Sequence, residues 1–579
     1  MWKVLLKSIR EYKKPSILAP TFVSLEVVIE CIIPFITAQL VNQIKSGCGI
    51  DVILKHGLLL LIMAGFSLMF GWLSGITCAT AASGFARNLR KDMFYSIQSF
   101  SFENIDKFSA SSLVTRLTTD VTNAQMAYMM LIRVAIRAPL MLIFAVIMSF
   151  IMGGRLALIF AFAIPFLGIG MYLIIRKVHP IFVKVFRKYD ALNMSIQENI
   201  QGIRVVKSFV REDYEKQKFE KASENVRLGF TRAEKILAFS SPMMQFCLYI
   251  NMVLILTLGS YTIISTQGLQ FNVGQLSALM VYSFQILNSL MMLSMVLVMV
   301  TIADESKRRI TEVLKEKSTL TNPVDPVREV KDGTIDFVGV NFKYSEKAER
   351  MALTNIDLHI GSGETIGILG GTGSSKTSLV QLIPRLYDAT EGTVRVGGLD
   401  VRNYDIESLR NQVSMVLQNN VLFSGTIREN LLWGDPSATD EEIRTACILA
   451  QADEFISGFP DGYNTHIEQG GTNVSGGQKQ RLCIARALLK KPKILILDDS
   501  TSAVDTHTDA KIRKAFLEAI PDTTKIIIAQ RVASVLDADR IILMDKGGIA
   551  AVGNHMELLE QSDIYREIYK SQNRVGEQL

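Results

Sequence analysis

Cysteine is scarce in this sequence of 579 residues, and so are the patterns of disulfide-rich and metal-binding proteins. The six cysteines are widely scattered, form no CxxC pair and have no histidine cluster beside them. The sequence therefore predicts neither a disulfide framework nor a zinc site. Basic residues form no long cluster and the net charge is only +6, so nucleic acid is not an expected partner.

Charged residues are also few, at 20% of the chain, whereas hydrophobic residues make up 49%. This balance is too apolar for an ordinary soluble protein of this size and far too apolar for a disordered one. We therefore expect a membrane protein. At about 100 to 200 residues per domain, the length allows about three to five domain-sized units.

The hydropathy changes near residue 305, from an apolar first half to a charged second half. The first half contains six apolar runs near the roughly 20 residues that cross a bilayer. We predict an α-helical six-span transmembrane domain with cytosolic extensions over residues 1–310, a linker over 311–330 and a soluble domain over 331–579. The runs lie at about 17–44, 56–81, 131–152, 156–175, 242–264 and 276–302.

The distribution of lysine and arginine predicts the orientation of these spans. The N-terminal segment MWKVLLKSIREYKK and the segments after the second and fourth runs are rich in both residues, whereas the loop STQGLQFNVGQ between the fifth and sixth runs has neither. Positive residues favour the cytoplasmic side. We expect a multi-pass protein of the plasma membrane with an uncleaved N-terminus, and with both termini and the soluble domain in the cytoplasm.

In the second half, apolar β-like runs such as ETIGILG, KILILDD and KIIIAQ alternate with helical stretches, which indicates an α/β domain with a largely parallel sheet. A glycine-rich loop follows the first of these runs. Its backbone N–H groups can cradle phosphate, Lys376 can neutralise the phosphate charge and Thr377 can coordinate Mg²⁺. An ordinary glycine turn is the alternative. The predicted phosphate-binding residues are Gly370, Gly371, Thr372, Gly373, Ser374, Ser375, Lys376 and Thr377.

The run KILILDD ends in two acids. Asp498 is placed to hold Mg²⁺ through water, and Asp499 is placed to polarise an attacking water as a catalytic base. The alternative is that the two acids merely end a strand and have no chemical role, and the nearby phosphate-binding loop argues against it. The second half is therefore predicted to be a P-loop nucleotide-binding domain.

Between the loop and the acids lies the motif VSGGQ, and here the sequence closely resembles the ATP-binding cassette (ABC) transporter family. The motif's serine hydroxyl and glycine N–H groups make a second anion site, which in the family faces the γ-phosphate bound to the opposite subunit. A dimer is thereby implied. Six spans followed by one cassette is the half-transporter layout of ABC exporters, so the resemblance covers essentially the whole chain. The signature residues are Val474, Ser475, Gly476, Gly477 and Gln478.

The resemblance implies further roles one residue at a time. Tyr344 matches the aromatic residue that stacks on adenine, although a tyrosine at a strand end is also ordinary packing. Gln418 matches the glutamine that couples Mg²⁺ and the attacking water to the membrane domain, and Asp505 matches the loop that communicates across the dimer. The stretches Glu103–Phe108 and Gly202–Arg211 match the cytosolic ends that touch cassettes in the family.

Three departures from the family pattern bear on the mechanism. Active members have glutamate where this chain has Asp499, whose carboxylate would stand about 1 Å too far from the water. They have histidine where this chain has Gln530, which cannot become cationic or relay a proton. They also have glycine at the position of Ser375. We therefore expect slow catalysis at this chain's own site. The expected catalytic residues are Asp499, Gln530 and Gln418, and the expected Mg²⁺ ligands are Thr377, Gln418 and Asp498.

With its intact signature, the chain resembles the degenerate-site subunit of bacterial heterodimeric multidrug ABC exporters, whose partner is a homologous half-transporter. A homodimer with two slow sites is the alternative. In the first span, Glu26 and Glu30 lie on one helical face, and intramembrane acids tend to line a cavity or meet a partner. They are candidates for a substrate cavity that accepts a cation, with snorkelling or an interhelical hydrogen bond as the equal alternative.

These patterns together predict an ATP-driven exporter of hydrophobic small molecules that sits in membrane lipid. A homodimeric lipid or peptide exporter is one alternative. The other is a regulatory ATPase of the membrane that transports nothing.

Overall fold

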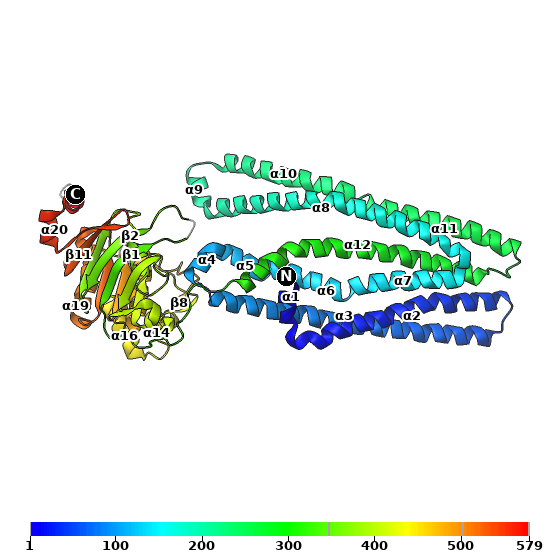
Figure 1. The fold of residues 1–579 in the computed structure, drawn as a ribbon, viewed down its shortest axis with the longest axis horizontal. Coiled ribbons are helices and arrows are strands. Elements are labelled where there is room, and N and C mark those ends of the chain that lie inside the picture. The colour runs from blue at the N-terminus through cyan, green and yellow to red at the C-terminus, as the bar shows by residue number, and fades with distance from the viewer. Residues whose placement is uncertain (1, 346–347, 500–502, 577–579) are drawn as a thin grey trace. The chain divides into compact units, whose positions relative to one another are not determined.

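The computed structural model of the chain describes residues 2–345, 348–499 and 503–576 (Figure 1). These residues form two compact units. The first falls within Met1–Gln98 and Ser109–Glu316, and the second within Ser99–Phe108 and Lys317–Leu579. The chain therefore enters the second unit twice, once through the short helix α4 (Phe102–Phe108) and again after residue 316.

The first unit consists of long helices (Figure 1). Within the described residues, five helical stretches are long and apolar enough to cross a membrane, and one of them, Ala110–Phe182, contains both the third and the fourth predicted runs. The helical transmembrane class is confirmed. The six predicted runs fall mainly in α2 (Lys13–Lys45), α3 (Ile50–Gln98), α7 (Val134–Gly153), α8 (Leu158–Gln201), α11 (Ser240–Ser265) and α12 (Val273–Lys315).

Several helices are longer than a bilayer requires. α3 has 49 residues and α8 has 44, which at 1.5 Å per residue gives about 66 to 74 Å, against about 30 Å for the hydrocarbon core. The polar α10 (Glu212–Leu237) packs against α8 and is followed by α11. Shorter elements complete the unit: α1 (Trp2–Leu5), η1 (Leu6–Tyr12), α5 (Ala110–Thr115), η2 (Arg116–Asp120), α6 (Val121–Ile132), η3 (Gly154–Ala157) and α9 (Ile203–Ser208).

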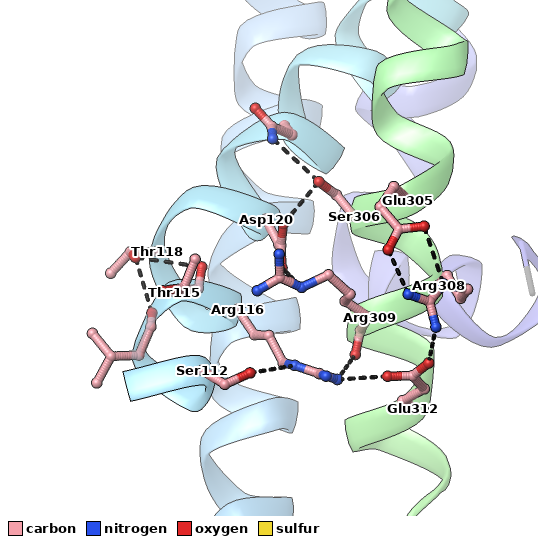
Figure 2. Close-up of polar contacts among 12 residues, drawn as sticks. Ser112, Thr115, Arg116, Thr118, Asp120, Glu305, Ser306, Arg308, Arg309 and Glu312 are labelled. Atoms are coloured by element: carbon pink, nitrogen blue, oxygen red, sulfur yellow. Dashed lines mark hydrogen bonds and ion pairs between the residues drawn. The ribbon is translucent and has the colours of Figure 1, made fainter. Parts of the chain in front are cut away.

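A polar network joins the end of α12 to the π-helical turn η2 (Figure 2). The Asp120 carboxylate accepts a hydrogen bond from Ser306 Oγ at 2.9 Å and pairs with Arg309 Nε at 3.0 Å. Arg116 Nη1 donates to the Arg309 carbonyl at 2.6 Å and to Glu312 Oε2 at 3.0 Å. Arg116 and Asp120 are buried, and buried charges are tolerated only with such partners. The network therefore fastens the last turns of α12 to the segment that follows α4.

The second unit contains a six-stranded sheet with the order β12-β11-β3-β10-β9-β6, in which only the β11–β12 pair is antiparallel. Its strands are β3 (Thr365–Gly370), β6 (Val413–Val416), β9 (Ile494–Asp498), β10 (Thr524–Ile528), β11 (Arg540–Asp545) and β12 (Gly548–Gly553). Alternate residues of β9 belong to two apolar cores, Ile494 and Ile496 to one and Leu495 and Leu497 to the other. Burial on both faces explains why this strand is a continuous apolar run.

The pairing of the central strands brings three loops together. β10 lies between β3 and β9, and Ile528 is in register with both Ile368 and Asp498. Parallel strands end at the same edge of a sheet, so the loops that follow β3, β9 and β10 start side by side. These loops carry the glycine-rich segment, Asp499 and Gln530. This edge carries the candidate site.

A four-stranded antiparallel sheet and a set of helices complete the second unit, which confirms the predicted α/β class. The strands of this sheet are β2 (Leu353–Ile360), β1 (Ile335–Phe342), β4 (Glu391–Val396) and β5 (Leu399–Asp400), and β7 (Gly425–Thr426) pairs with β8 (His466–Ile467). The main helices are α13 (Lys376–Gln381), α14 (Ile406–Gln412), α15 (Ile427–Leu431), α16 (Asp440–Leu449), α17 (Asp453–Ser457), α18 (Gly476–Leu489), α19 (Thr506–Ala519), α20 (His555–Gln561) and α21 (Asp563–Gly576).

Candidate functional site

The glycine-rich loop connects β3 to α13. A Cβ on Gly370 would lie 2.3 Å from the Met544 carbonyl oxygen, so no other residue fits there without a shift. Ser375 adopts the left-handed conformation, with φ +69° and ψ +26°. That conformation costs a non-glycine residue about 1 to 2 kcal/mol. A glycine would adopt this conformation without that cost, so this chain builds the loop with a serine under strain.

The Lys376 ammonium is held across this loop. Its Nζ donates to the carbonyl oxygens of Gly370 at 2.8 Å and Gly371 at 2.9 Å, and lies 3.4 Å from Ser374 Oγ. Burial lowers the pKa of Lys376, and the nearby charges of Asp498 and Asp499 oppose that shift. A cation in this place can neutralise phosphate oxygens cradled by the loop.

Thr377 on α13 and Asp498 at the end of β9 are in contact. Thr377 Oγ1 donates to Asp498 Oδ2 at 2.8 Å. Asp498 is only 2% exposed, and burial raises its pKa, while the Thr377 hydrogen bond and Lys376 lower it. Gln418 hydrogen-bonds the neighbouring Asp499. A hydroxyl, a buried carboxylate and an amide oxygen are hard oxygen ligands of the kind that Mg²⁺ prefers, so the residues present fit that metal.

Asp499 follows β9 and has φ +49°. Its Oδ2 accepts a hydrogen bond from Gln530 Nε2 at 3.0 Å. Burial raises the pKa of Asp499, whereas hydrogen bonds from Gln418 and Gln530 and the charges of Lys376 and Arg531 lower it. The three residues expected from the sequence to act in hydrolysis therefore lie together around one carboxylate.

Tyr344 lies beside α13 and is 42% exposed. Its hydroxyl hydrogen-bonds Ser378 Oγ at 2.8 Å and donates to Gln381 Oε1 at 3.2 Å. Its ring packs edge-on against Tyr387 at 5.2 Å between centroids. The ring is thus fixed by packing and still presents a face to solvent, where a planar base could stack.

Tyr387 is a residue that sequence reasoning missed. Its hydroxyl donates to Asp106 Oδ2 at 2.7 Å, and its ring lies 6.1 Å from that of Phe102. Both partners are on α4, which contains the stretch Glu103–Phe108 that the resemblance matches to the cytosolic ends touching cassettes. Tyr387 therefore links α4 to the aromatic cluster that contains Tyr344. No local pattern around Tyr387 could have shown this, because the partners are 281 positions apart.

The signature residues form a local structure at the start of α18. Ser475 Oγ accepts from the Gln478 backbone N–H at 3.3 Å, and Gln478 Oε1 accepts from the Ser475 N–H at 2.9 Å. Val474 packs partly buried against the core beneath them. A Cβ on Gly477 would lie 2.9 Å from the Ala503 carbonyl oxygen, while Gly476 has only an ordinary contact.

Asp505 caps α19. Its carboxylate accepts from the Thr508 N–H at 2.9 Å, and this contact lowers its pKa. The first three residues of the motif STSAVD, 500–502, lie outside the described residues.

In the first unit, Met1–Gln98 with Ser109–Glu316, which we call the membrane unit, Glu26 and Glu30 share one cation that the sequence analysis did not single out. Arg137 on α7 donates through Nη1 to Glu26 Oε1 at 2.5 Å and through Nη2 to both oxygens of Glu30 at 2.8 Å. Gly71 on α3 leaves room for Glu26, since a Cβ there would lie 3.0 Å from Oε1. An arginine within the apolar run 131–152 was the available signal, because such a charge requires a counter-ion.

This group contains two carboxylates and one guanidinium, so it has one acidic side chain more than it has cations. The Glu26 side chain is only 9% exposed, and its Oε2 has no hydrogen-bond partner within the described part of the chain. The sequence analysis offered a substrate cavity or, equally, snorkelling or an interhelical hydrogen bond for the two acids, and the structure shows that they make interhelical contacts with Arg137. It also leaves one buried carboxylate oxygen without a donor.

Comparisons with known proteins agree over both units. Two family models match, one described as "ABC transporter transmembrane region" over residues 17–290 and one as "ABC transporter" over residues 353–502. The Bacillus subtilis "Uncharacterized ABC transporter ATP-binding protein YfiB" is 36% identical over 555 residues, which is 94% of each chain. The Staphylococcus aureus "Putative multidrug export ATP-binding/permease protein SAB1799c" is 32% identical over 488 residues, which is 84% of each chain. A solved bacterial Atm1-family ABC exporter with ATP bound has a TM-score of 0.84 at 23% identity, covering 97% of this chain and 99% of that one, and so has the same fold.

Proposed function

This chain belongs to the ABC transporter family and is an ATP-hydrolysing, multi-pass membrane protein, and we propose that it is the degenerate-site half of a heterodimeric exporter. Residues 1–310 would form the transmembrane domain, 311–330 the linker and 331–579 the cytoplasmic nucleotide-binding domain. Both termini would be cytoplasmic.

The contact between Gln530 and Asp499 supports a slow site. Active family members place glutamate and histidine at these positions. Here the shorter carboxylate of Asp499 accepts from an amide at 3.0 Å, and that amide can neither carry positive charge nor pass on a proton. The carboxylate is therefore held in place but gains no help in polarising water.

The rest of this site supports ATP binding. Lys376 and the loop N–H groups would hold the phosphates, Tyr344 would stack on adenine, and Thr377, Gln418 and Asp498 would hold Mg²⁺. Bound Mg²⁺ would shield the charge on the phosphates. The ordered signature at the start of α18 would complete the site of a homologous partner that supplies its own glutamate and histidine.

Steady-state ATP turnover in lipid tests this division of labour. We expect negligible turnover for the chain alone and robust turnover for the chain with its partner. Robust turnover alone would show that Asp499 and Gln530 suffice, and the protein would then be a homodimeric exporter.

The substrate is proposed to be a hydrophobic compound that carries one positive charge. Two carboxylates share the single guanidinium of Arg137, and Glu26 Oε2 has no donor among the described residues, which supports a site that accepts one cationic donor. The name of the Staphylococcus aureus relative is consistent with drug export.

Inside-out vesicles containing the chain and its partner provide the test. ATP-dependent uptake of a lipophilic cation should exceed uptake of its neutral isostere, and Glu30→Gln should reduce this preference. Equal uptake of the two compounds would rule out charge selection. Uptake only of lipid or peptide would identify the alternative exporters, and no ATP-dependent uptake at all would favour a regulatory ATPase.

A further inference from the structure

The C-terminal helix α21 contacts the loop that follows β10. The side chain of Gln572 on this helix makes two hydrogen bonds to the loop backbone. Its Oε1 accepts from the Val532 N–H at 2.8 Å, and its Nε2 donates to the Gln530 carbonyl oxygen at 2.9 Å. The side-chain amide of Gln572 therefore bonds the loop backbone at the residues before and after Arg531.

The helix that carries Gln572 is itself firmly anchored. Tyr565 is fully buried, and its hydroxyl hydrogen-bonds His555 Nδ1 on α20 at 2.7 Å. The Tyr569 ring lies edge-on to the His555 ring at 5.1 Å, and Ile568 and Tyr569 pack against the apolar core of the unit. Gln572 lies less than one helical turn after the last of these anchors, Tyr569, so the core fixes the part of the helix that carries it.

The loop in turn leads to the carboxylate of the site. Gln530 has its carbonyl oxygen bound by Gln572 and its side-chain amide bound to Asp499 Oδ2 at 3.0 Å. On the other side, Val532 is 2% exposed and packs in the core. A continuous line of contacts thus runs from α21 through the backbone of residues 530–532 to Asp499.

We propose that Gln572 is a positioning residue for ATP hydrolysis, which orients Gln530 toward Asp499 by fixing the backbone of the loop between them. The inference rests on the proposed roles of Asp499 and Gln530, but not on the presence of a heterodimeric partner. Without the two hydrogen bonds, the loop would hold Gln530 less precisely, and Gln530 would in turn hold the Asp499 carboxylate less precisely in place. Misplacement by a fraction of an ångström at a reacting centre slows a reaction by about three- to tenfold.

The test is the single-turnover hydrolysis of γ-labelled ATP by the full-length protein in lipid, in whichever assembly the turnover experiment above identifies. In a pair, the partner's own catalytic acid is replaced, so that the measured rate belongs to this chain's site. Followed to completion with protein in excess, even a slow site yields both a rate constant and an ATP affinity. Gln572→Ala should lower the rate constant about three- to tenfold and change the affinity by less than about twofold.

Amide hydrogen exchange supplies a readout that does not depend on activity. In Gln572→Ala, the Val532 amide should exchange about tenfold faster, while the amides of α21 stay protected, which shows that the helix remains folded. Ser571→Ala, at the neighbouring exposed position of α21, is the matched control and should change neither measurement.

Gln572→Glu separates the two hydrogen bonds. A carboxylate can still accept from the Val532 N–H but cannot donate to the Gln530 carbonyl oxygen. In Gln572→Glu, the Val532 amide should then remain protected from exchange, while the rate constant of hydrolysis should be as low as in Gln572→Ala. An unchanged rate constant in Gln572→Ala, with or without faster exchange, would overturn the proposal, and so would a lower rate explained entirely by weaker ATP binding.

Discussion

The side-chain amide of Gln530 donates a hydrogen bond to the carboxylate of Asp499 across 3.0 Å. The two residues are 31 positions apart and meet because β9 and β10 are neighbours in the sheet. An amide satisfies the carboxylate without supplying positive charge. This contact is the physical basis of the slow hydrolysis that we propose for the site.

Restoring the family's acid and histidine should activate this chain. We expect Asp499→Glu combined with Gln530→His to raise ATP turnover of the chain alone by at least about tenfold, because the longer carboxylate reaches the water and imidazole can carry charge. Asp499→Asn with Gln530→His lacks a base and serves as the control. If turnover does not rise, slow hydrolysis does not originate in these two residues.

The pH dependence of hydrolysis should reflect the environment of Asp499. Burial raises its pKa above the usual aspartate range, so the ionised form that polarises water is lost at a higher pH than for an ordinary aspartate. Gln530→Leu removes a hydrogen bond that lowers this pKa and should move the acid limb of the single-turnover rate further upward. Gln561→Leu, at an exposed position of α20, is the control. A limb that stays in place or moves downward would contradict the assignment.

Ser375 should tolerate glycine better than alanine. Because its φ is +69°, Ser375→Gly relieves a backbone strain of about 1 kcal/mol in the folded loop, so this variant should unfold at a higher temperature than Ser375→Ala. Ser375→Ala keeps the strain and removes only the hydroxyl. Thermal unfolding of both variants gives the comparison, and ATP titration checks that neither variant loses binding. Equal unfolding temperatures would show that the left-handed conformation of Ser375 does not strain the loop.

Removing Arg137 should destabilise the membrane unit. Arg137→Met leaves the buried Glu26 carboxylate without its cation, which costs about 3 to 5 kcal/mol. Adding Glu26→Gln removes the orphaned charge and should recover much of the loss. The fraction folded after extraction into detergent reports both effects. Full stability of the single variant would mean that the ion pair contributes little.

Tyr387→Phe should weaken communication through α4 without weakening ATP binding. The variant loses only the hydroxyl that donates to Asp106, and we expect ATP-driven transport to fall about fivefold, the effect of one hydrogen bond to a charged group. Tyr463→Phe is a matched control, because the Tyr463 hydroxyl donates at the same distance of 2.7 Å to Asp453 elsewhere in the unit. Equal transport by the two variants would exclude Asp106 and Tyr387 from coupling.

The amino-acid sequence alone was enough to predict the fold class and the family. Apolar runs of membrane-spanning length and continuously apolar strands are local features whose meaning does not depend on distant residues. The glycine-rich loop, the acids after KILILDD and the VSGGQ motif likewise lie within single short segments. The replacements at Ser375, Asp499 and Gln530 could be recognised in the same way, by their places within known motifs.

Only the tertiary structure decided which of these residues meet and which further residues hold them. The strand order brings Asp499 to Gln530, the packing of α2 on α7 delivers Arg137 to Glu26 and Glu30, and the docking of α21 brings Gln572 to the loop after β10. Each contact joins separate segments of the sequence, and neither Arg137 nor Gln572 lies in a motif that would have indicated its partner. Hydropathy and motif spacing describe the chain locally, whereas these pairings follow from how whole helices and strands pack.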